Sequence, residues 1–245
     1  IGHGIQLEKM NMTTIAIHQP NYIPWLGYFY KIVNSDIFVF LDDAQFSKNS
    51  YTNRVQIFGK DEKIRWLTVP VSNRLGQSIN EVLPSTIDWK SRHIDSLYGL
   101  YSKAKNFKYV WDDIQEIYDA VDTSDSISRI NSILIIKISN ILGIHTDFQY
   151  SSQLNAKGVG EDRLISIVSS ISSSGFYLSG SGGKKYQNQE SFINAGLGLK
   201  YTDFSHPNYY QWSSLFQPGL SIFDPIFHLG WDKTSALLGV NLGDK

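Results

Sequence analysis

The stretch TTIAIHQPNYIPWLGYFYKIVNSDIFVFL, residues 13–41, decides the fold class. It begins with a β-branched run at residues 13–17, passes through two prolines, takes helical apolar spacing over residues 25–33 and ends in a second apolar run at residues 36–41. Both apolar runs are continuous, which is typical of parallel strands that are buried on both faces. The stretch therefore predicts a strand, a loop, a crossover helix and a second, parallel strand.

The rest of the chain continues this alternation. The spacing of apolar residues predicts further strands at residues 144–150, 176–179 and 199–204, and helices at residues 89–122 (two), 126–142, 161–174 and 189–195. Residues 54–58 and 64–71 are β-like and flank a polar turn, which suits a hairpin beside the main sheet. We expect an α/β protein with a largely parallel sheet, flanking helices, an inserted β-hairpin and a helical segment at about 89–142.

Composition excludes several classes of protein. The chain has 245 residues, 42% of them hydrophobic, and a formal net charge of -1, so neither disorder nor general nucleic-acid binding is expected. It has no cysteine, which removes disulfides, thiolate metal sites and cysteine nucleophiles. The longest apolar run is far shorter than the roughly 20 residues that span a bilayer. We expect a cytoplasmic protein with one domain over residues 12–245, preceded by a leader or added extension at residues 1–11.

Polar residues follow the first predicted strand, beginning at His18. Ligands of parallel α/β sheets bind outside the carboxyl ends of the strands, which makes this loop a candidate site. His18 can act as a general base, a general acid or a charge stabiliser, and Gln19, Asn21 and Tyr22 accompany it on a stretch stiffened by proline. The alternative is that His18 and Asn21 bond only loop backbone groups while Tyr22 packs in the core.

Two aspartates, Asp42 and Asp43, follow the second predicted strand. Because adjacent strand residues point to opposite faces, at most one of them should face a given site, where it can orient a histidine or hold a substrate amine. The alternative is that both cap the turn. Downstream polar candidates for holding a donor or a phosphate are Gln45, Asn49 and Arg54, although Arg54 could instead pair with Asp42 or Asp43.

A glycine-rich loop follows the strand at residues 176–179. Glycines let backbone N–H groups gather around an anion, which makes this loop a candidate phosphate site, and a flexible surface turn is the alternative. Its candidate residues are Ser179, Gly180, Gly182, Lys184 and Tyr186. The loop lacks the spacing of a P-loop.

Two further histidines differ in their surroundings. His206 follows the last predicted strand, beside a proline and several aromatic residues that suit a sugar or a nucleobase. The alternative is that these aromatic residues simply pack in the core. His228 lies in an apolar stretch and is expected to pack in the core. No spacing typical of a metal site appears, so no metal is predicted and the cofactor stays open.

These stretches resemble the WbqC-like family of bacterial proteins. The resemblance rests on five blocks in the family's order, at residues 18–28, 38–47, 66–71, 177–180 and 203–207. In the glycine-rich loop, Ser181 stands where the family usually has proline. The family occurs with O-antigen and polysaccharide biosynthesis genes, which implies modification of an activated sugar.

The resemblance leads us to expect a transferase that attaches an acyl or aminoacyl group to a nucleotide-linked aminosugar. His18 or His206 would take the amine proton, with Asp42 or Asp43 orienting the reacting group. Nucleotidyl transfer or ATP-dependent ligation is an alternative, and a non-catalytic protein that binds nucleotide-linked sugars is another. The expected partners are the sugar and its acyl donor, while the oligomeric state stays open.

Overall fold

The computed structural model describes residues 12–240 and has a five-stranded parallel sheet at its centre. The strands lie in the order β7-β2-β1-β8-β9, and every neighbouring pair is parallel. Their bounds are β1 Thr14–His18, β2 Ile37–Phe40, β7 Asp147–Tyr150, β8 Phe176–Ser179 and β9 Gly198–Tyr201. This sheet confirms the predicted α/β class.

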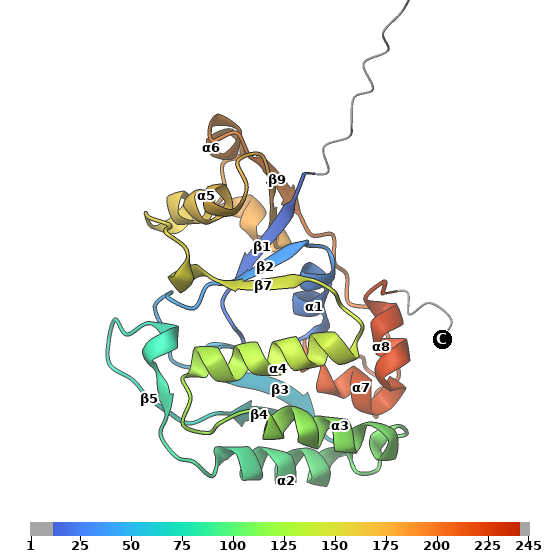
Figure 1. The fold of residues 1–245 in the computed structure, drawn as a ribbon. Helices are drawn as coiled ribbons and strands as arrows, with labels where there is room; N and C mark the ends of the chain where they lie inside the picture. Colours follow the sequence, from blue (N-terminus) through green and yellow to red (C-terminus); the bar gives the residue numbers. More distant parts are fainter. Residues whose placement is uncertain (1–11, 241–245) are drawn as a thin grey trace, which may run out of the picture.

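Helices cover both faces of the sheet (Figure 1). Helices α1 (Leu26–Val33) and α4 (Ile127–Ile141) lie on one face, and α5 (Gly160–Ile171) and α6 (Gln189–Asn194) lie on the other. Along β1, Ala16 packs in the cluster under α1, whereas Ile15 and Ile17 pack in the cluster under α5. The pleat therefore buries residues on both faces, which explains the continuous apolar runs.

The chain between β2 and α4 forms a separate layer. Its hairpin, β3 (Arg54–Phe58) and β4 (Ile64–Thr68), is antiparallel as predicted but makes a sheet of its own instead of extending the main one. A short pair that the sequence did not predict, β5 with β6, follows it. The remaining bounds are β5 Val71–Ser72, β6 Leu83–Pro84, α2 Trp89–Tyr101, α3 Phe107–Asp119, α7 Phe223–Leu229 and α8 Trp231–Leu237.

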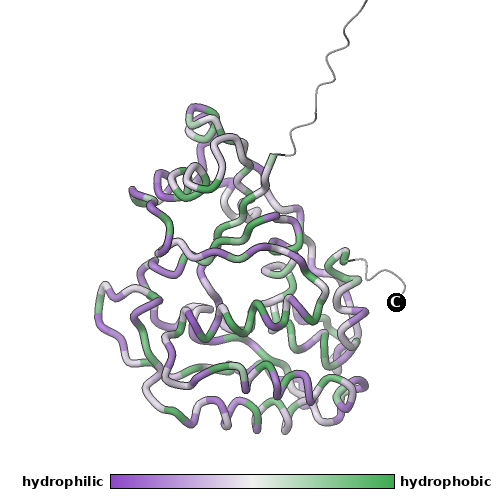
Figure 2. Tube along the Cα trace, in the orientation of Figure 1, coloured by the Kyte–Doolittle hydropathy of each residue, from purple (hydrophilic) through white to green (hydrophobic). Residues whose placement is uncertain are grey.

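One hydrophobic cluster joins the sheet to this inserted layer. It contains Phe38 and Phe40 of the sheet together with Val55 of the hairpin, Leu97 of α2 and Ile117 of α3. Figure 2 shows hydrophobic stretches along the strands and along α4, which lies between the two parts. The predicted extension at residues 1–11 lies outside the described residues.

A buried hydrogen-bond chain fixes the loop after β1 to the inserted layer. The Nε2 atom of His93 lies 3.0 Å from the Thr68 carbonyl oxygen, which can only accept, so Nε2 carries the proton. Nδ1 then accepts from the Tyr22 hydroxyl at 2.7 Å, and Tyr22 in turn accepts from Tyr118 at 2.9 Å. His93 is thus neutral, and burial lowers its pKa to about 4 from the ordinary 6.5.

This chain predicts that the protein loses stability in mild acid. As pH falls below 6.5, His93 becomes protonated in the unfolded chain, whereas in the folded chain it stays neutral down to its pKa of about 4. The free energy of unfolding therefore decreases as pH falls from 6.5 to about 4. His93→Gln can keep both hydrogen bonds without titrating and should flatten this dependence. Urea unfolding at several pH values measures it. The exposed His145→Gln is the control, and an equal flattening in both variants would contradict the prediction.

Candidate functional site

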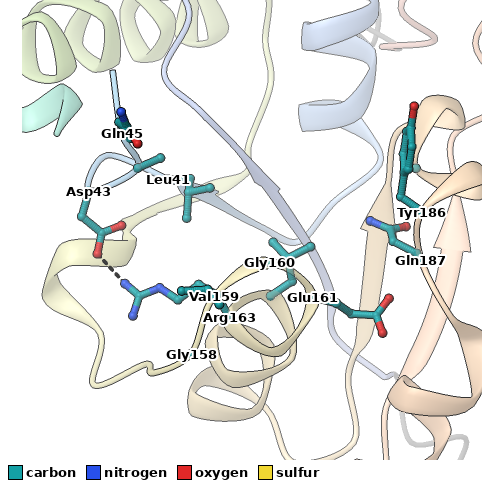
Figure 3. Close-up of a pocket in the computed structure, with 13 residues that line it drawn as sticks. Leu41, Asp43, Gln45, Gly158, Val159, Gly160, Glu161, Arg163, Tyr186 and Gln187 are labelled. Carbon is teal, nitrogen blue, oxygen red and sulfur yellow. Dashed lines mark hydrogen bonds and ion pairs between the residues drawn. The ribbon is translucent and has the colours of Figure 1, made fainter. Parts of the chain in front are cut away.

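A cleft of about 860 Å³ lies at the carboxyl edge of the sheet (Figure 3). Three segments line it: the loop after β2, the start of α5 and the loop after β8. The lining residues are Leu41, Asp43, Ala44, Gln45, Gly158, Val159, Gly160, Glu161, Arg163, Leu164, Gly183, Tyr186 and Gln187. The cleft occurs where ligands of parallel α/β sheets usually bind.

An ion pair holds one wall of the cleft. Arg163 of α5 donates to the Asp43 carboxylate and also to the Ala156 carbonyl oxygen. The Ser151 hydroxyl donates to the same carboxylate at 2.5 Å. Because the Arg163 and Asp43 side chains are 20% and 29% exposed, both charges can reach a ligand in the cleft.

The start of α5 offers backbone donors to the cleft. Gly158 and Gly160 have positive φ values of 92° and 56°, a conformation that favours glycine, and no side chain caps the first turn. Free N–H groups at a helix N-terminus suit an anion. Glu161 accepts the Asn188 backbone N–H at 2.7 Å, which links this wall to the loop after β8. On that opposite wall, Tyr186 is 85% exposed and its ring is open to a ligand.

His18 lies at the same edge but on the α1 face of the sheet. Its Nδ1 lies 3.0 Å from the Gln19 carbonyl oxygen, so Nδ1 carries the proton and Nε2 keeps a free lone pair. Its ring meets the edges of Tyr28 and Trp25 at centroid distances of 4.8 and 6.4 Å. Burial and the charge of Lys31 lower the pKa of His18 to about 4, which keeps the ring neutral.

Lys31 brings a buried amine close to this histidine. β1 pairs with β8 only as far as Ala16, and the Lys31 Nζ donates to the carbonyl oxygen of the next residue, Ile17, at 2.7 Å. Burial lowers the pKa of Lys31 to about 7. A partly uncharged amine therefore lies where the strand order reverses.

His206 shares the α1 face with His18. Its ring packs edge-on against Phe204 at 4.9 Å, and burial lowers its pKa. A Cβ atom on Gly27, at the start of α1, would lie 2.8 Å from the Phe204 ring and 3.0 Å from the Trp25 indole nitrogen. The two predicted histidines thus flank the start of α1, while the cleft opens on the α5 face.

The other predicted residues separate into four groups. Asp43, Gln45 and Tyr186 line the cleft, and Ser179 at the end of β8 and Gly180, Gly182 and Lys184 in the adjoining loop do not. Asn21 and Tyr22 are buried, while the Gln19 carbonyl oxygen accepts from His18 and Tyr28. Asn49 and Arg54 lie at the hairpin. The alternative pairing of Arg54 with Asp42 or Asp43 is wrong, because Arg54 forms no salt bridge among residues 12–240 and Asp43 pairs with Arg163.

Asp42 is buried and holds the turn after β7 through hydrogen bonds. It is 4% exposed, and its two oxygens accept the Ser152 N–H at 2.9 Å and the Ser152 hydroxyl at 2.6 Å. As the sequence predicted, only one of the two aspartates faces the cleft. His228 is buried among aromatic rings as expected, but neither of its ring nitrogens has a hydrogen-bond partner among the described residues.

Sequence reasoning missed Arg163, Glu161 and Gln187. Arg163 lies on a predicted helix, 120 residues away from its partner Asp43, and no local pattern indicates that pairing. A usable signal was present in Gly158-Val-Gly160, two glycines directly before a helix. The middle segment of the glycine-rich loop also differs from expectation, because residues Ser181–Lys185 form a 3₁₀ helix.

Residues 12–240 contain neither a cluster of metal-ligating side chains nor a helix that could span a membrane. No group of three or more His, Cys, Asp or Glu side chains in this range could hold a metal ion. No helix in the same range has the length and apolar character needed to cross a membrane.

Comparison with known proteins identifies relatives by sequence. The model of the WbqC-like protein family matches residues 19–236. Uncharacterized protein Rv1507c of Mycobacterium tuberculosis is 32% identical over 224 residues, which cover 89% of this chain and 95% of that protein. No solved structure matches the chain.

The different surroundings of the two aspartates predict different effects of substitution. Asp42→Ala removes the hydrogen bonds that a buried carboxylate accepts from the Ser152 N–H and hydroxyl, and should lower the free energy of unfolding by about 1–3 kcal/mol. Asp43→Ala breaks a partly exposed ion pair and should cost less, about 1 kcal/mol or below. Urea unfolding of both variants checks the order, and a larger loss in Asp43→Ala would refute these assignments.

Proposed function

The chain belongs to the WbqC-like protein family, and from that membership we propose that it is a transferase acting on a nucleotide-linked aminosugar. In this proposal it attaches an acyl or aminoacyl group to the sugar amine in the biosynthesis of a bacterial surface polysaccharide such as O-antigen. The observation that carries the proposal is the cleft at the carboxyl edge of a parallel sheet. Since nucleotide-linked sugars are cytoplasmic compounds, we propose a cytoplasmic reaction.

The position and size of the cleft support a nucleotide-sized ligand. The strand order β7-β2-β1-β8-β9 reverses between β1 and β8, and ligands of such sheets bind at the reversal. The cleft extends from the loop after β2 to the loop after β8, on either side of β1. Its volume of about 860 Å³ falls within the roughly 300–1,000 Å³ typical of small-molecule sites.

The lining suggests how such a ligand would lie. The diphosphate would accept hydrogen bonds from the first turn of α5 and from Arg163. Tyr186 would stack on the base or on the sugar ring. Asp43 and Gln45 would hold the sugar's hydroxyl or amine groups.

The proposed chemical step is acyl transfer to the amine. The amine nitrogen forms a bond to the acyl carbon, the donor's leaving group departs with its bonding electron pair, and the amine gives up a proton. We propose His18 Nε2 as the proton acceptor, since Nδ1–H already donates to Gln19 and the ring is neutral. His18 lies on the α1 face and Asp43 lines the cleft on the α5 face, so the ligand would cross the carboxyl edge of the sheet to reach His18, with Asp43 holding it on the cleft side.

The strand order also favours a second candidate function. In chain order the sheet reads 3-2-1-4-5, the order of nucleotide-binding doubly wound sheets. Nucleotidyl transfer or ATP-dependent ligation would use the same cleft, with ATP as substrate. Release of diphosphate from ATP in the presence of the sugar would favour this candidate over acyl transfer.

The cleft predicts binding of nucleotide-linked sugars that depends on Tyr186. Calorimetry with a panel of nucleotide-linked aminosugars and ATP should find at least one ligand. Tyr186→Ala should weaken it by about 1–3 kcal/mol, the usual contribution of one stacked base. The matched control is Tyr109→Ala, another exposed tyrosine, on α3 and outside the cleft. Absence of binding across the panel would refute the proposal, and binding without turnover would indicate a non-catalytic binding protein.

The proton-acceptor role predicts a loss of rate with binding retained. His18→Gln should lower turnover about 10²–10⁴-fold, the usual contribution of a general base, while the ligand dissociation constant changes little. Mass spectrometry of the acylated sugar measures turnover, and a thermal melt shows whether the variant is folded. Full turnover in a folded His18→Gln would exclude His18 as the base.

A further inference from the structure

A cluster of partly exposed aromatic rings and one arginine lies on the hairpin, away from the cleft. We call it the Arg54 corner, and it comprises Trp25, Tyr51, Arg54 and Trp66. Tyr51 precedes β3 and Trp66 lies in β4, and their side chains are 39% and 41% exposed. The Tyr51 ring lies 5.1 Å from Trp25 and 5.8 Å from Trp66, tilted by 59° and 53°. Neither pair is stacked, and Tyr51 and Trp66 both keep exposed ring surface, while Trp25 is partly buried.

Arg54 places a positive charge in this corner. Its guanidinium carbon lies 4.1 Å from the centroid of the Trp66 ring. Among residues 12–240 it forms no salt bridge, whereas Arg65 on the neighbouring strand pairs with Asp61. Its Nε is enclosed by protein and has no hydrogen-bond partner among the described residues. An anion would therefore bind the terminal nitrogens of the guanidinium fork.

The two residues directly before Arg54 also carry buried polar atoms without a hydrogen-bond partner among the described residues. Thr52 and Asn53 are 1% and 4% exposed, yet the Thr52 hydroxyl and the Asn53 side-chain oxygen have no hydrogen-bond partner. Buried polar atoms in folded proteins are rarely left unpaired, and three consecutive residues here each carry one. These atoms are enclosed by protein, so they mark a buried polar segment directly before Arg54 and are not themselves ligand contacts.

We propose that the Arg54 corner binds a phosphate attached to a ring. The planar fork of Arg54 suits two phosphate oxygens, and a ring can lie on the exposed ring surface of Tyr51. A sugar phosphate and a nucleoside monophosphate share this chemistry. The corner lies on the α1 face with His18, whose ring is 6.4 Å from Trp25, whereas the cleft is on the α5 face. The corner is therefore separate from the cleft, although Trp25 borders His18, and its ligand binding does not rest on the proposed transferase activity.

The test compares three probes on the full chain: glucose 1-phosphate, UMP and inorganic phosphate. Calorimetry should show that at least one of the two ring phosphates binds more tightly than inorganic phosphate. Arg54→Met keeps an apolar stem over Trp66 but removes the fork, and should weaken that ligand about tenfold or more. Arg65→Met, which removes an arginine from the neighbouring strand, should leave its affinity unchanged. Tyr51→Leu should weaken the ring phosphate without affecting inorganic phosphate.

Each result supports or overturns the proposal. Tighter binding of glucose 1-phosphate assigns a sugar ring, and tighter binding of UMP assigns a nucleobase. The proposal is overturned if neither ring phosphate binds at millimolar concentration, or if a folded Arg54→Met binds as well as Arg65→Met. If Tyr51→Leu binds the ring phosphate with unchanged affinity, the ligand's ring does not lie on Tyr51, and that part of the proposal is overturned. If Tyr186→Ala rather than Arg54→Met removes binding, the ligand occupies the cleft, which overturns the corner and leaves the proposed function standing.

Discussion

The parallel pairing of β1 with β2 on one side and with β8 on the other is the constraint on which the rest of the structure depends. A parallel pair needs a crossover connection, and right-handed crossovers that leave a central strand in opposite directions lie on opposite faces of the sheet. Helix α1 therefore covers one face and α5 the other. Both helices begin at the carboxyl edge of the sheet, so the cleft and the surroundings of His18 form at that edge but on opposite faces.

Much of this arrangement follows from local sequence, because continuous apolar runs show which strands are buried on both faces. Once the strands are located, the loops that follow β1, β2 and β8 are candidate ligand sites, because ligands bind at the carboxyl ends of parallel strands. The face of the sheet to which each side chain points was not predicted, since a shift of one residue reverses the face. In the structure Ala16 and His18 point to the α1 face, while Leu41 at the end of β2 faces the cleft. The polar residues at this edge therefore lie in two separate places, with His18 on the α1 face and the cleft on the α5 face.

Long-range pairing accounts for the other misses. The hairpin was recognisable from its two β-like runs and its turn, but its separation from the main sheet depends on packing against α2 and α3. Its buried side, with Val55 and Leu67, joins the same hydrophobic cluster as Leu97 and Ile117. A sequence pattern shows that a hairpin has an apolar face and leaves open what covers it. The same limit hid Arg163, whose partner lies in another loop.

A buried carboxyl group, Asp224, shows that the fold accepts a large desolvation cost away from the cleft. Asp224 is fully buried without a cation, and burial raises its pKa to about 6 although it accepts from Tyr101 at 2.8 Å and from Tyr209 at 2.7 Å. The Asp43–Arg163 pair in the cleft differs, because both side chains are partly exposed. A partly exposed pair contributes only about 0–1 kcal/mol, so Arg163 can exchange Asp43 for a ligand phosphate at little cost. That exchange would free the Asp43 carboxylate to accept from the ligand, and one ion pair would then supply both a cation for the phosphate and an acceptor for an amine.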